Sequence, residues 1–210
     1  MQALQTAEQV GEELCTFLGM THRPVGIKLH RKPVDDHRKL EKPLYFCRTV
    51  REAASGKDFL ITIDDEGCAD AEVVLGFRES KLVDLEPRIK DSTIHAVSIG
   101  PLDNAEVVLL ILNPEQAMTV AHLLGGVDAH FSGNLSVCGE AVAKVVNEGK
   151  ANVSFLCEGA RFYGQYEPQE VVLSLPYEAF LQLPERMAKF SSLSHKAREG
   201  LKQLFLRMGR

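Results

Sequence analysis

The chain has 210 residues, of which 45% are hydrophobic and 25% charged, and its formal net charge is −5 at pH 7. This length and composition are typical of a globular protein and exclude an intrinsically disordered one. The negative charge argues against non-specific nucleic-acid binding, and no stretch has the roughly 18 apolar residues of a membrane helix. We expect one globular domain over residues 1–185 and a basic C-terminal helix over residues 186–210, with neither nucleic acid nor membrane as a partner.

The N-terminal sequence MQALQTAEQVGEELC lacks the basic start and apolar core of a secretory signal. We therefore expect a cytoplasmic protein. In a reducing compartment its five cysteines are expected to be buried thiols, reactive thiols or metal ligands, and not a disulfide framework.

Up to residue 100, the sequence predicts alternating helices and strands. An approximate apolar stripe predicts a first helix over residues 3–18. Gly56 is expected to end the second helix. The predicted elements after the first helix are, in order, a strand in RPVGIKLH (23–30), a helix in PLYFCRTVREAAS (43–55), a strand in DFLITID (58–64), a short helix in CADAEVVLGF (68–77) and a strand in IHAVSIG (94–100).

The stretch AEVVLLILNPEQAMTVAHLLGG, residues 105–126, gives the clearest local signal. Its continuous apolar run predicts a strand buried on both faces. Asn113 is a good N-cap residue and Pro114 favours the first helical position, so a helix is expected to follow at once. Further strands are predicted between Lys150 and Cys157 and in EVVLSLP (170–176), and a helical tail from about Tyr177.

Two stretches share one plan: Cys, helix, Gly-Lys, strand, Cys. They are YFCRTVREAASGKDFLITIDDEGCAD (45–70) and SVCGEAVAKVVNEGKANVSFLCEG (136–159). The spacing differs between them: eleven residues separate the Gly of Gly-Lys from the second cysteine in the first stretch, and seven do in the second stretch. We interpret residues 24–100 and 105–175 as diverged pseudo-repeats about a pseudo-twofold axis, with chance similarity of short β-α-β units as the alternative. The expected fold is α/β or α+β, with a mixed sheet of about six strands flanked by helices.

The four repeated cysteines, Cys47, Cys68, Cys138 and Cys157, each fall at or near a predicted helix start. Backbone N–H groups there stabilise thiolate and are expected to lower the thiol pKa. Two cysteines from each half would supply a Cys₄ site for a [4Fe–4S] cluster or zinc. The absence of a C-x₂-C pair argues against both, and buried or nucleophilic thiols remain alternatives. Cys15, outside the repeats, is expected to belong to the core.

Basic side chains accompany the cysteine segments of this acidic chain. Arg48, Lys57, Lys150 and Arg161 are predicted to bind an anion such as phosphate or carboxylate, or to balance the charge of a cluster. The alternative is a set of solvated surface cations.

An acidic turn precedes Cys68. Asp64, Asp65 and Glu66 could act as acids or bases, but a solvated turn is the default expectation for three consecutive acidic residues. No serine–histidine–aspartate order and no nucleotide fingerprint occurs, so catalytic residues stay unassigned.

Several of these segments together resemble a known family, domain of unknown function 169. They are RPVGIKL, FCRTVREAASGK, GCADAEVVLGF, VCGEAVAKVVNEGKANVSFLCEGAR and EVVLSLPYE. The resemblance covers roughly residues 20–185. It implies a protein of archaea and anaerobic bacteria, a setting that suits an oxygen-sensitive cluster, and it implies no particular activity.

The leading hypothesis is an iron–sulfur or metal-binding protein with Cys47, Cys68, Cys138 and Cys157 as ligands, linked to electron transfer or to redox handling of a small molecule. One alternative is a thiol-dependent enzyme acting on an anionic small molecule, held by Arg48 or Arg161. Another is a non-catalytic module that binds a cofactor or small molecule. The amphipathic tail could pack on the domain or on a second copy of the chain.

Overall fold

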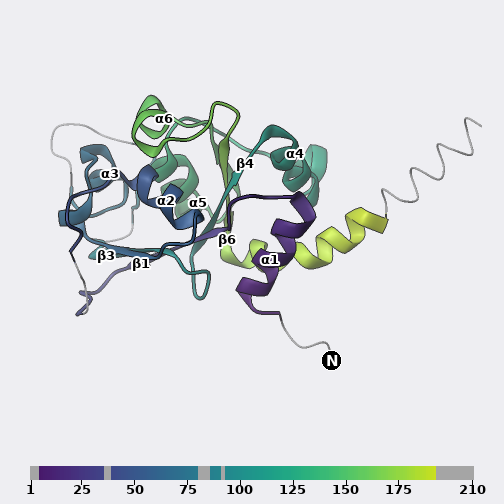
Figure 1. Cartoon of the computed structure of the whole chain (residues 1–210), viewed down its shortest axis with the longest axis horizontal. Coiled ribbons are helices and arrows are strands. Elements are labelled where there is room, and N and C mark those ends of the chain that lie inside the picture. The colour runs from purple at the N-terminus through teal and green to yellow at the C-terminus, as the bar shows by residue number, and fades with distance from the viewer. Residues whose placement is uncertain (1–4, 36–38, 80–85, 91–92, 193–210) are drawn as a thin grey trace, which may run out of the picture.

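The computed structural model describes residues 5–35, 39–79, 86–90 and 93–192. They form a six-stranded sheet with helices on both faces (Figure 1). The strands are β1 (Val25–His30), β2 (Phe59–Ile61), β3 (Ala96–Gly100), β4 (Val107–Leu112), β5 (Asn152–Ser154) and β6 (Val171–Pro176), in the spatial order β2-β3-β1-β4-β6-β5.

The helices begin and end largely where the sequence predicts. The α-helices are α1 (Ala7–Leu18), α2 (Phe46–Ala54), α3 (Ala69–Val74), α4 (Pro114–Leu123), α5 (Lys144–Glu148), α6 (Glu158–Gly164) and α7 (Tyr177–Leu181). The shorter turns are the 3₁₀ helices η1 (Ile63–Asp65) and η2 (Gly126–Asp128) and the π-helix η3 (Val137–Ala143), which leads directly into α5.

Local signals account for several of these boundaries. Asn113 caps α4 by accepting a hydrogen bond from the backbone N–H of Gln116, as predicted, and Pro114 is the first helical residue. Gly149 ends α5 in the left-handed conformation, at a φ of 64°, which a glycine adopts without strain. The tail is helical over residues 183–192, while residues 193–210 of the predicted basic helix lie outside the described residues.

The prediction of six strands flanked by helices is confirmed, but the prediction of a mixed sheet is wrong. Every neighbouring pair of these strands is antiparallel. The β-α-β connection from β1 to β2 does make these two strands parallel, but β3 lies between them and runs the other way. The same happens in the second half, where β6 lies between β4 and β5. Each half is thus a split β-α-β unit.

The strand register supports the interpretation of two similar halves. Gly26 of β1 faces Val108 of β4 at the centre of the sheet, and the flanking pairs are Val25–Leu109 and Ile27–Val107, as a twofold axis through the central pair requires. Outward from this pair, β3 and β2 follow β1 on one side, and β6 and β5 follow β4 on the other.

The outer strands have matching registers as well. Gly100 lies opposite Gly26, and Leu175 lies opposite Val108. One residue before each of these, Ile99 pairs with Phe59, the first residue of β2, and Ser174 pairs with Asn152, the first residue of β5. The two halves therefore share their strand pairing residue by residue.

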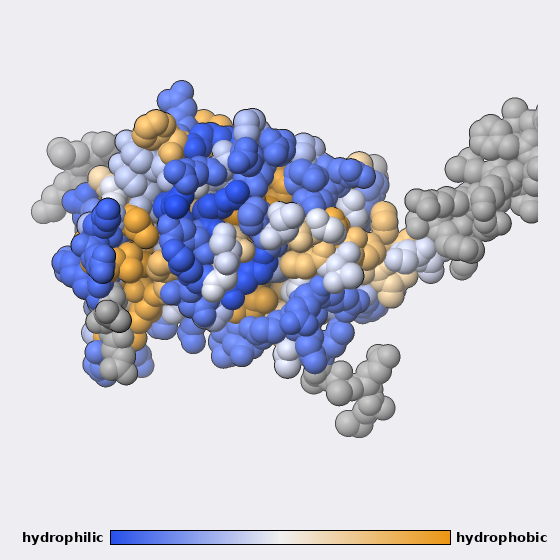
Figure 2. All heavy atoms as spheres, viewed as in Figure 1, coloured by the Kyte–Doolittle hydropathy of each residue, from blue (hydrophilic) through white to orange (hydrophobic). Residues whose placement is uncertain are grey.

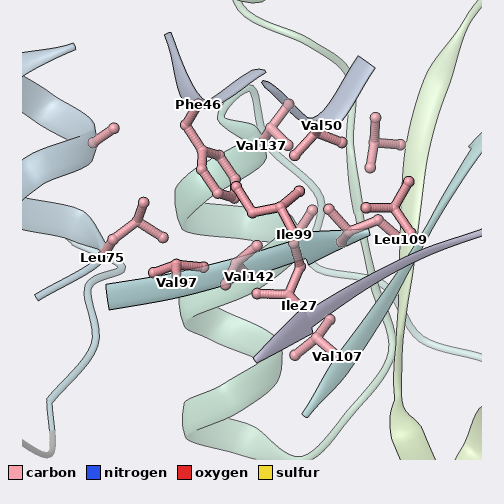
Figure 3. Close-up of a cluster of buried hydrophobic side chains, with 14 of the residues drawn as sticks. Ile27, Phe46, Val50, Leu75, Val97, Ile99, Val107, Leu109, Val137 and Val142 are labelled. Atoms are coloured by element: carbon pink, nitrogen blue, oxygen red, sulfur yellow. The ribbon is translucent and has the colours of Figure 1, made fainter. Parts of the chain in front are cut away.

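The core has two layers, one on each face of the sheet. All residues of β4 are buried, which confirms the predicted two-sided burial. Val107, Leu109 and Ile111 pack with α2, α3 and η3, whereas the alternate residues of β4 pack with α1, α4 and α7. Figure 3 shows the first layer, where Phe46 and Val137 lie above Ile99 and Ile27 of the sheet.

None of the helices in the described ranges combines the length and the apolarity needed to cross a membrane.

Candidate four-cysteine site

The four repeated cysteines lie at helix starts, as predicted. Cys47 is the second residue of α2, and Cys138 is the second residue of η3. Cys68 and Cys157 are the N-cap residues of α3 and α6. The first cysteine of each half thus occupies one kind of position and the second cysteine another. All four are half-buried at the edge of the core layer that contains α2 and η3.

The backbone donors around the first cysteines also match. The N–H of the following residue, Arg48 or Gly139, favours the thiolate form of Cys47 or Cys138. Both N–H groups belong to the first turn of a helix, and they donate their hydrogen bonds to the Tyr45 carbonyl at 2.8 Å and to Ser136 Oγ at 3.1 Å.

The second cysteines interact with a different backbone N–H, three residues along the chain. Cys157 Sγ accepts a hydrogen bond from the N–H of Ala160 at 3.3 Å and so takes the part that an N-cap oxygen normally plays. The N–H of Ala71 favours the thiolate form of Cys68, but the Cys68 side chain makes no cap hydrogen bond.

The strongest electrostatic interactions between these cysteines cross between the halves. Cys47 Sγ lies 3.9 Å from the carbonyl oxygen of Gly159 in α6, the helix that Cys157 caps. Among the thiolates, Cys157 has the largest electrostatic effect on Cys47, and Cys68 has the largest effect on Cys138. These two interactions are equivalent under the pseudo-twofold axis.

Weaker interactions join the two pairs into one group. Cys47 also interacts electrostatically with Cys68, and Cys138 with Cys47. Four thiols that are scattered along the sequence thus lie within electrostatic reach of one another around the axis.

The expectation of lowered thiol pKa values is wrong for three of the four. Burial raises the pKa of Cys47 to about 12, and the neighbouring thiolate of Cys157 raises it further. Burial also raises the pKa values of Cys68 and Cys138. Loss of hydration penalises the thiolate more than the helix N–H groups favour it. These thiols are therefore protonated at neutral pH when no metal is bound.

The thiols are spread more widely than the ligands of a single ion. Among the residues that the structure describes, no three histidine, cysteine, aspartate or glutamate side chains converge closely enough to hold one metal ion. Four sulfur atoms around one zinc ion would lie about 4 Å apart, because each Zn–S bond is about 2.3 Å long. A [4Fe–4S] cluster separates its four thiolates more, since each one binds a different iron.

A buried carboxylate lies beside the thiols, which corrects the expectation of a solvated acidic turn. Glu66 is only 5% exposed. Its Oε1 accepts the backbone N–H groups of Phe46 and Cys68 at 3.0 and 2.9 Å. Its Oε2 is the only buried side-chain oxygen or nitrogen within the described ranges that has no hydrogen-bond partner. Burial raises the pKa of Glu66 to about 7.

Two of the predicted anion-binding cations share one acidic partner. Arg48 Nε lies 2.8 Å from Glu52 Oε1, and Lys57 Nζ lies 2.7 Å from Glu52 Oε2. Arg48 also hydrogen-bonds to Gln165 in the loop after α6. Both cations are thus engaged within the protein, and their role in anion binding stays a prediction.

The other two predicted cations lie in different surroundings. The guanidinium of Arg161 donates to the backbone carbonyls of Phe155 and Glu170 at 3.1 and 3.0 Å, and to that of Glu167. Arg161 therefore links these loops of the second half through hydrogen bonds. Lys150 lines a surface cavity of about 410 Å³ next to residues of α7 and of the helix that follows it. The four cations do not converge on one anion site.

A stacked aromatic pair, which the sequence did not single out, spans the halves beside the site. The rings of Tyr45, directly before α2, and Tyr163, in α6, lie parallel with centroids 3.9 Å apart. Phe162 packs edge-on against Tyr163 and is 77% exposed. Figure 2 shows apolar side chains at the surface where Figure 1 places α6.

A second cross-half contact fixes the helix that carries Cys47. Arg51 of α2 forms an ion pair with Glu170, at 2.7 Å, and its guanidinium lies 5.4 Å from the centre of the Tyr166 ring. The Tyr166 hydroxyl donates to the carbonyl of Cys47 at 3.0 Å. The loop before β6 thereby positions α2.

Comparison with known proteins agrees with the resemblance seen in the sequence. The model of DUF169, described as "Uncharacterised ArCR", matches residues 13–86 and 80–186. An uncharacterized protein of Methanocaldococcus jannaschii is 31% identical over 119 residues, which is 52% of this chain and 51% of that protein, so the match spans about half the length of this relative. No solved structure matches. The chain belongs to the family of domain of unknown function 169.

Proposed function

We propose that the protein binds a metal centre through the thiolates of Cys47, Cys68, Cys138 and Cys157, and that this centre is a [4Fe–4S] cluster with a redox-linked role. The observation that carries the proposal is the gathering of these thiols around the pseudo-twofold axis, where each half contributes two. A Cys₄ ligand set of this kind holds such clusters in other proteins.

The backbone around the thiols favours an anionic centre. A cluster with four thiolates carries net negative charge, and N–H groups that point at sulfur stabilise it. Here the N–H of Ala160 donates to Cys157 Sγ, and the N–H groups of Arg48, Gly139 and Ala71 favour the thiolate forms of Cys47, Cys138 and Cys68. These N–H groups come from four separate helix starts.

The spread of the thiols favours a cluster over zinc. In the described part of the chain no three ligating side chains converge on a single-ion position. A cubane is larger than one ion, and each of its irons needs only one protein thiolate. The protons on the thiols would leave as the metal binds, since only thiolate is a ligand.

The raised thiol pKa values make a nucleophilic enzyme the weaker candidate. A cysteine nucleophile works as thiolate, and active sites lower the thiol pKa for that purpose. Cys47 has a pKa of about 12 because it is buried, which leaves very little thiolate at neutral pH. Metal binding is the chemistry that turns buried thiols of this kind into thiolates.

The test is the iron, zinc and acid-labile sulfide content of protein purified without oxygen, together with its visible absorption spectrum. We expect about four irons and four sulfides per chain. Each of Cys47→Ser, Cys68→Ser, Cys138→Ser and Cys157→Ser should lose most of the iron and the colour. Cys15→Ser is the matched control, because Cys15 lies in α1, outside this group of thiols, and it should keep both.

Two results would contradict the proposal. Folded, colourless protein without metal, even after reconstitution with iron and sulfide, would remove the metal centre altogether. One zinc per chain without sulfide would replace the cluster by a zinc site.

A further inference from the structure

The two halves differ in length at one place beside the four-cysteine site. Six residues separate Ile61, the end of β2, from Cys68, but only two separate Ser154, the end of β5, from Cys157. The longer segment forms η1 and ends in Glu66 and Gly67. The equivalent parallel bridges, Leu44–Glu66 and Asn134–Ser154, place a serine where the first half has Glu66, so the carboxylate has no counterpart in the second half.

The longer segment is held firmly in place. The carboxylate of Asp65 accepts the N–H and the hydroxyl of Thr62, both at 2.9 Å, and the N–H of Leu40 at 2.8 Å. Leu44 forms a parallel bridge with Glu66. The hydrogen bonds of Asp65, the preceding residue, and the bridge to Leu44 therefore fix the position of Glu66.

One oxygen of Glu66 has a structural role and the other has none. Oε1 accepts N–H groups at the starts of α2 and α3, the two helices that bring Cys47 and Cys68 into the site. Oε2 is buried and has no partner. A buried polar atom without a hydrogen bond costs about 1–3 kcal/mol, and more if it is charged. Such atoms are rare in native proteins and call for an explanation, such as an ion that binds there.

Glu66 lies among the thiols. Its carboxylate interacts electrostatically with the thiolates of Cys47, Cys68 and Cys138. Without metal the protonated thiols carry no charge, whereas bound metal cations would favour the thiolates and the ionised carboxylate together.

We propose that Glu66 is a fifth protein group of the four-cysteine site and that its Oε2 binds one iron of the cluster. This inference rests on the proposed function. The first half then supplies two thiolates and a carboxylate, whereas the second supplies two thiolates only. One iron of the four has an oxygen ligand in addition to its thiolate, and the bound centre lacks the symmetry of the fold around it.

The test is the Mössbauer spectrum of the full chain, reconstituted without oxygen with ⁵⁷Fe and sulfide. The wild-type protein should show one iron that differs from the other three, because an oxygen ligand changes the electron density at that iron. Glu66→Gln should make the four irons alike at unchanged iron and sulfide content. Its amide oxygen can still accept the two N–H bonds of Oε1, so the fold should be retained. Circular dichroism and the melting temperature of the metal-free variant check this.

Asp64→Asn is the matched control. It removes one carboxylate from the same turn, but the Asp64 side chain is 67% exposed and pairs with the exposed Lys39. Its spectrum should equal that of the wild type.

The outcomes separate this inference from the proposed function. A cluster that needs the four cysteines but gives the same spectrum in Glu66→Gln and wild type overturns the role of Glu66 alone. Wild-type protein without iron overturns both.

Discussion

The first and second halves of the molecule have the same strand order and register but different side chains at equivalent points. The central strands meet at Gly26 and Val108, and each half adds two outer strands in matching register. The residue before the first cysteine is Phe46 in one half and Val137 in the other. Only the first half has the turn that carries Glu66.

The comparison separates what the site needs from what each half adds. The features that occur twice are the backbone pairing, the helix starts and the four thiols, which are the parts that a shared centre requires. Two features occur only once. Glu66 lies beside the thiols, and the loop with Glu170 contacts α2 of the other half. The halves therefore differ most where one of them contacts the other or lies beside the four thiols.

The largest effect on stability is expected at the pair of residues before the first cysteines. Phe46 and Val137 are both buried in the same core layer (Figure 3). Phe46→Ala should lower the free energy of unfolding by about 3–5 kcal/mol. Val137→Ala removes a smaller side chain and should cost about 1.5–3 kcal/mol. Urea denaturation measures both. Equal losses would show that the two positions are not packed as described.

A cross-half ion pair gives the next effect. Arg51→Met removes the positive partner of the buried Glu170 carboxylate. It should lower the free energy of unfolding by about 3 kcal/mol in the same measurement. Lys189→Met breaks an exposed pair with Glu185 and should cost less than about 1 kcal/mol. A loss at Arg51 no larger than that at Lys189 would mean that this contact does not hold the halves together.

The central pair of strands offers a third test. A Cβ atom at Gly26 would lie 1.9 Å from the carbonyl oxygen of Pro101, so Gly26→Ala must displace the backbone. We expect a loss of about 1–3 kcal/mol from such overpacking. The equivalent Val108 has room for a full side chain in its own half. An unchanged melting temperature of Gly26→Ala would count against the register described for β1.

The smallest effect concerns pH. Burial lowers the pKa of His22 below 6.5, and repulsion by Arg51 adds to this, while Glu170 opposes it. The neutral form is thus favoured in the folded protein, and its stabilising effect is complete above pH 6.5. It is lost as the pH falls from there through the folded pKa. His22→Gln should flatten the fall in melting temperature over that range, and an unchanged slope would exclude His22 as its source.

Much of the fold could be predicted from the sequence because its signals are local. The cap at Asn113, the helix starts at the cysteines and the apolar run of β4 each depend on a few neighbouring residues. The insertion of β3 between β1 and β2 is not local, since it depends on which strand edge a distant segment reaches. No short motif records that choice.

The sequence pointed to the positions of the four cysteines at helix starts, but not to the pKa values of their thiols. The repeat pointed to the four cysteines, yet the pKa of Cys47 depends on burial by α6, far away in the sequence. Glu66 looked like part of a solvated turn. The unequal spacing before Cys68 and Cys157 was the one sequence signal that could have drawn attention to it.

We infer that the four thiols of the two halves form one site, with each first cysteine next to the second cysteine of the other half. A short bifunctional thiol cross-linker, applied at alkaline pH to reduced, metal-free, folded protein, tests this arrangement when the linked peptides are identified by mass spectrometry. Cys47–Cys157 and Cys68–Cys138 should be the main products. Links only within the halves, Cys47–Cys68 and Cys138–Cys157, or four thiols that each react alone, would contradict it.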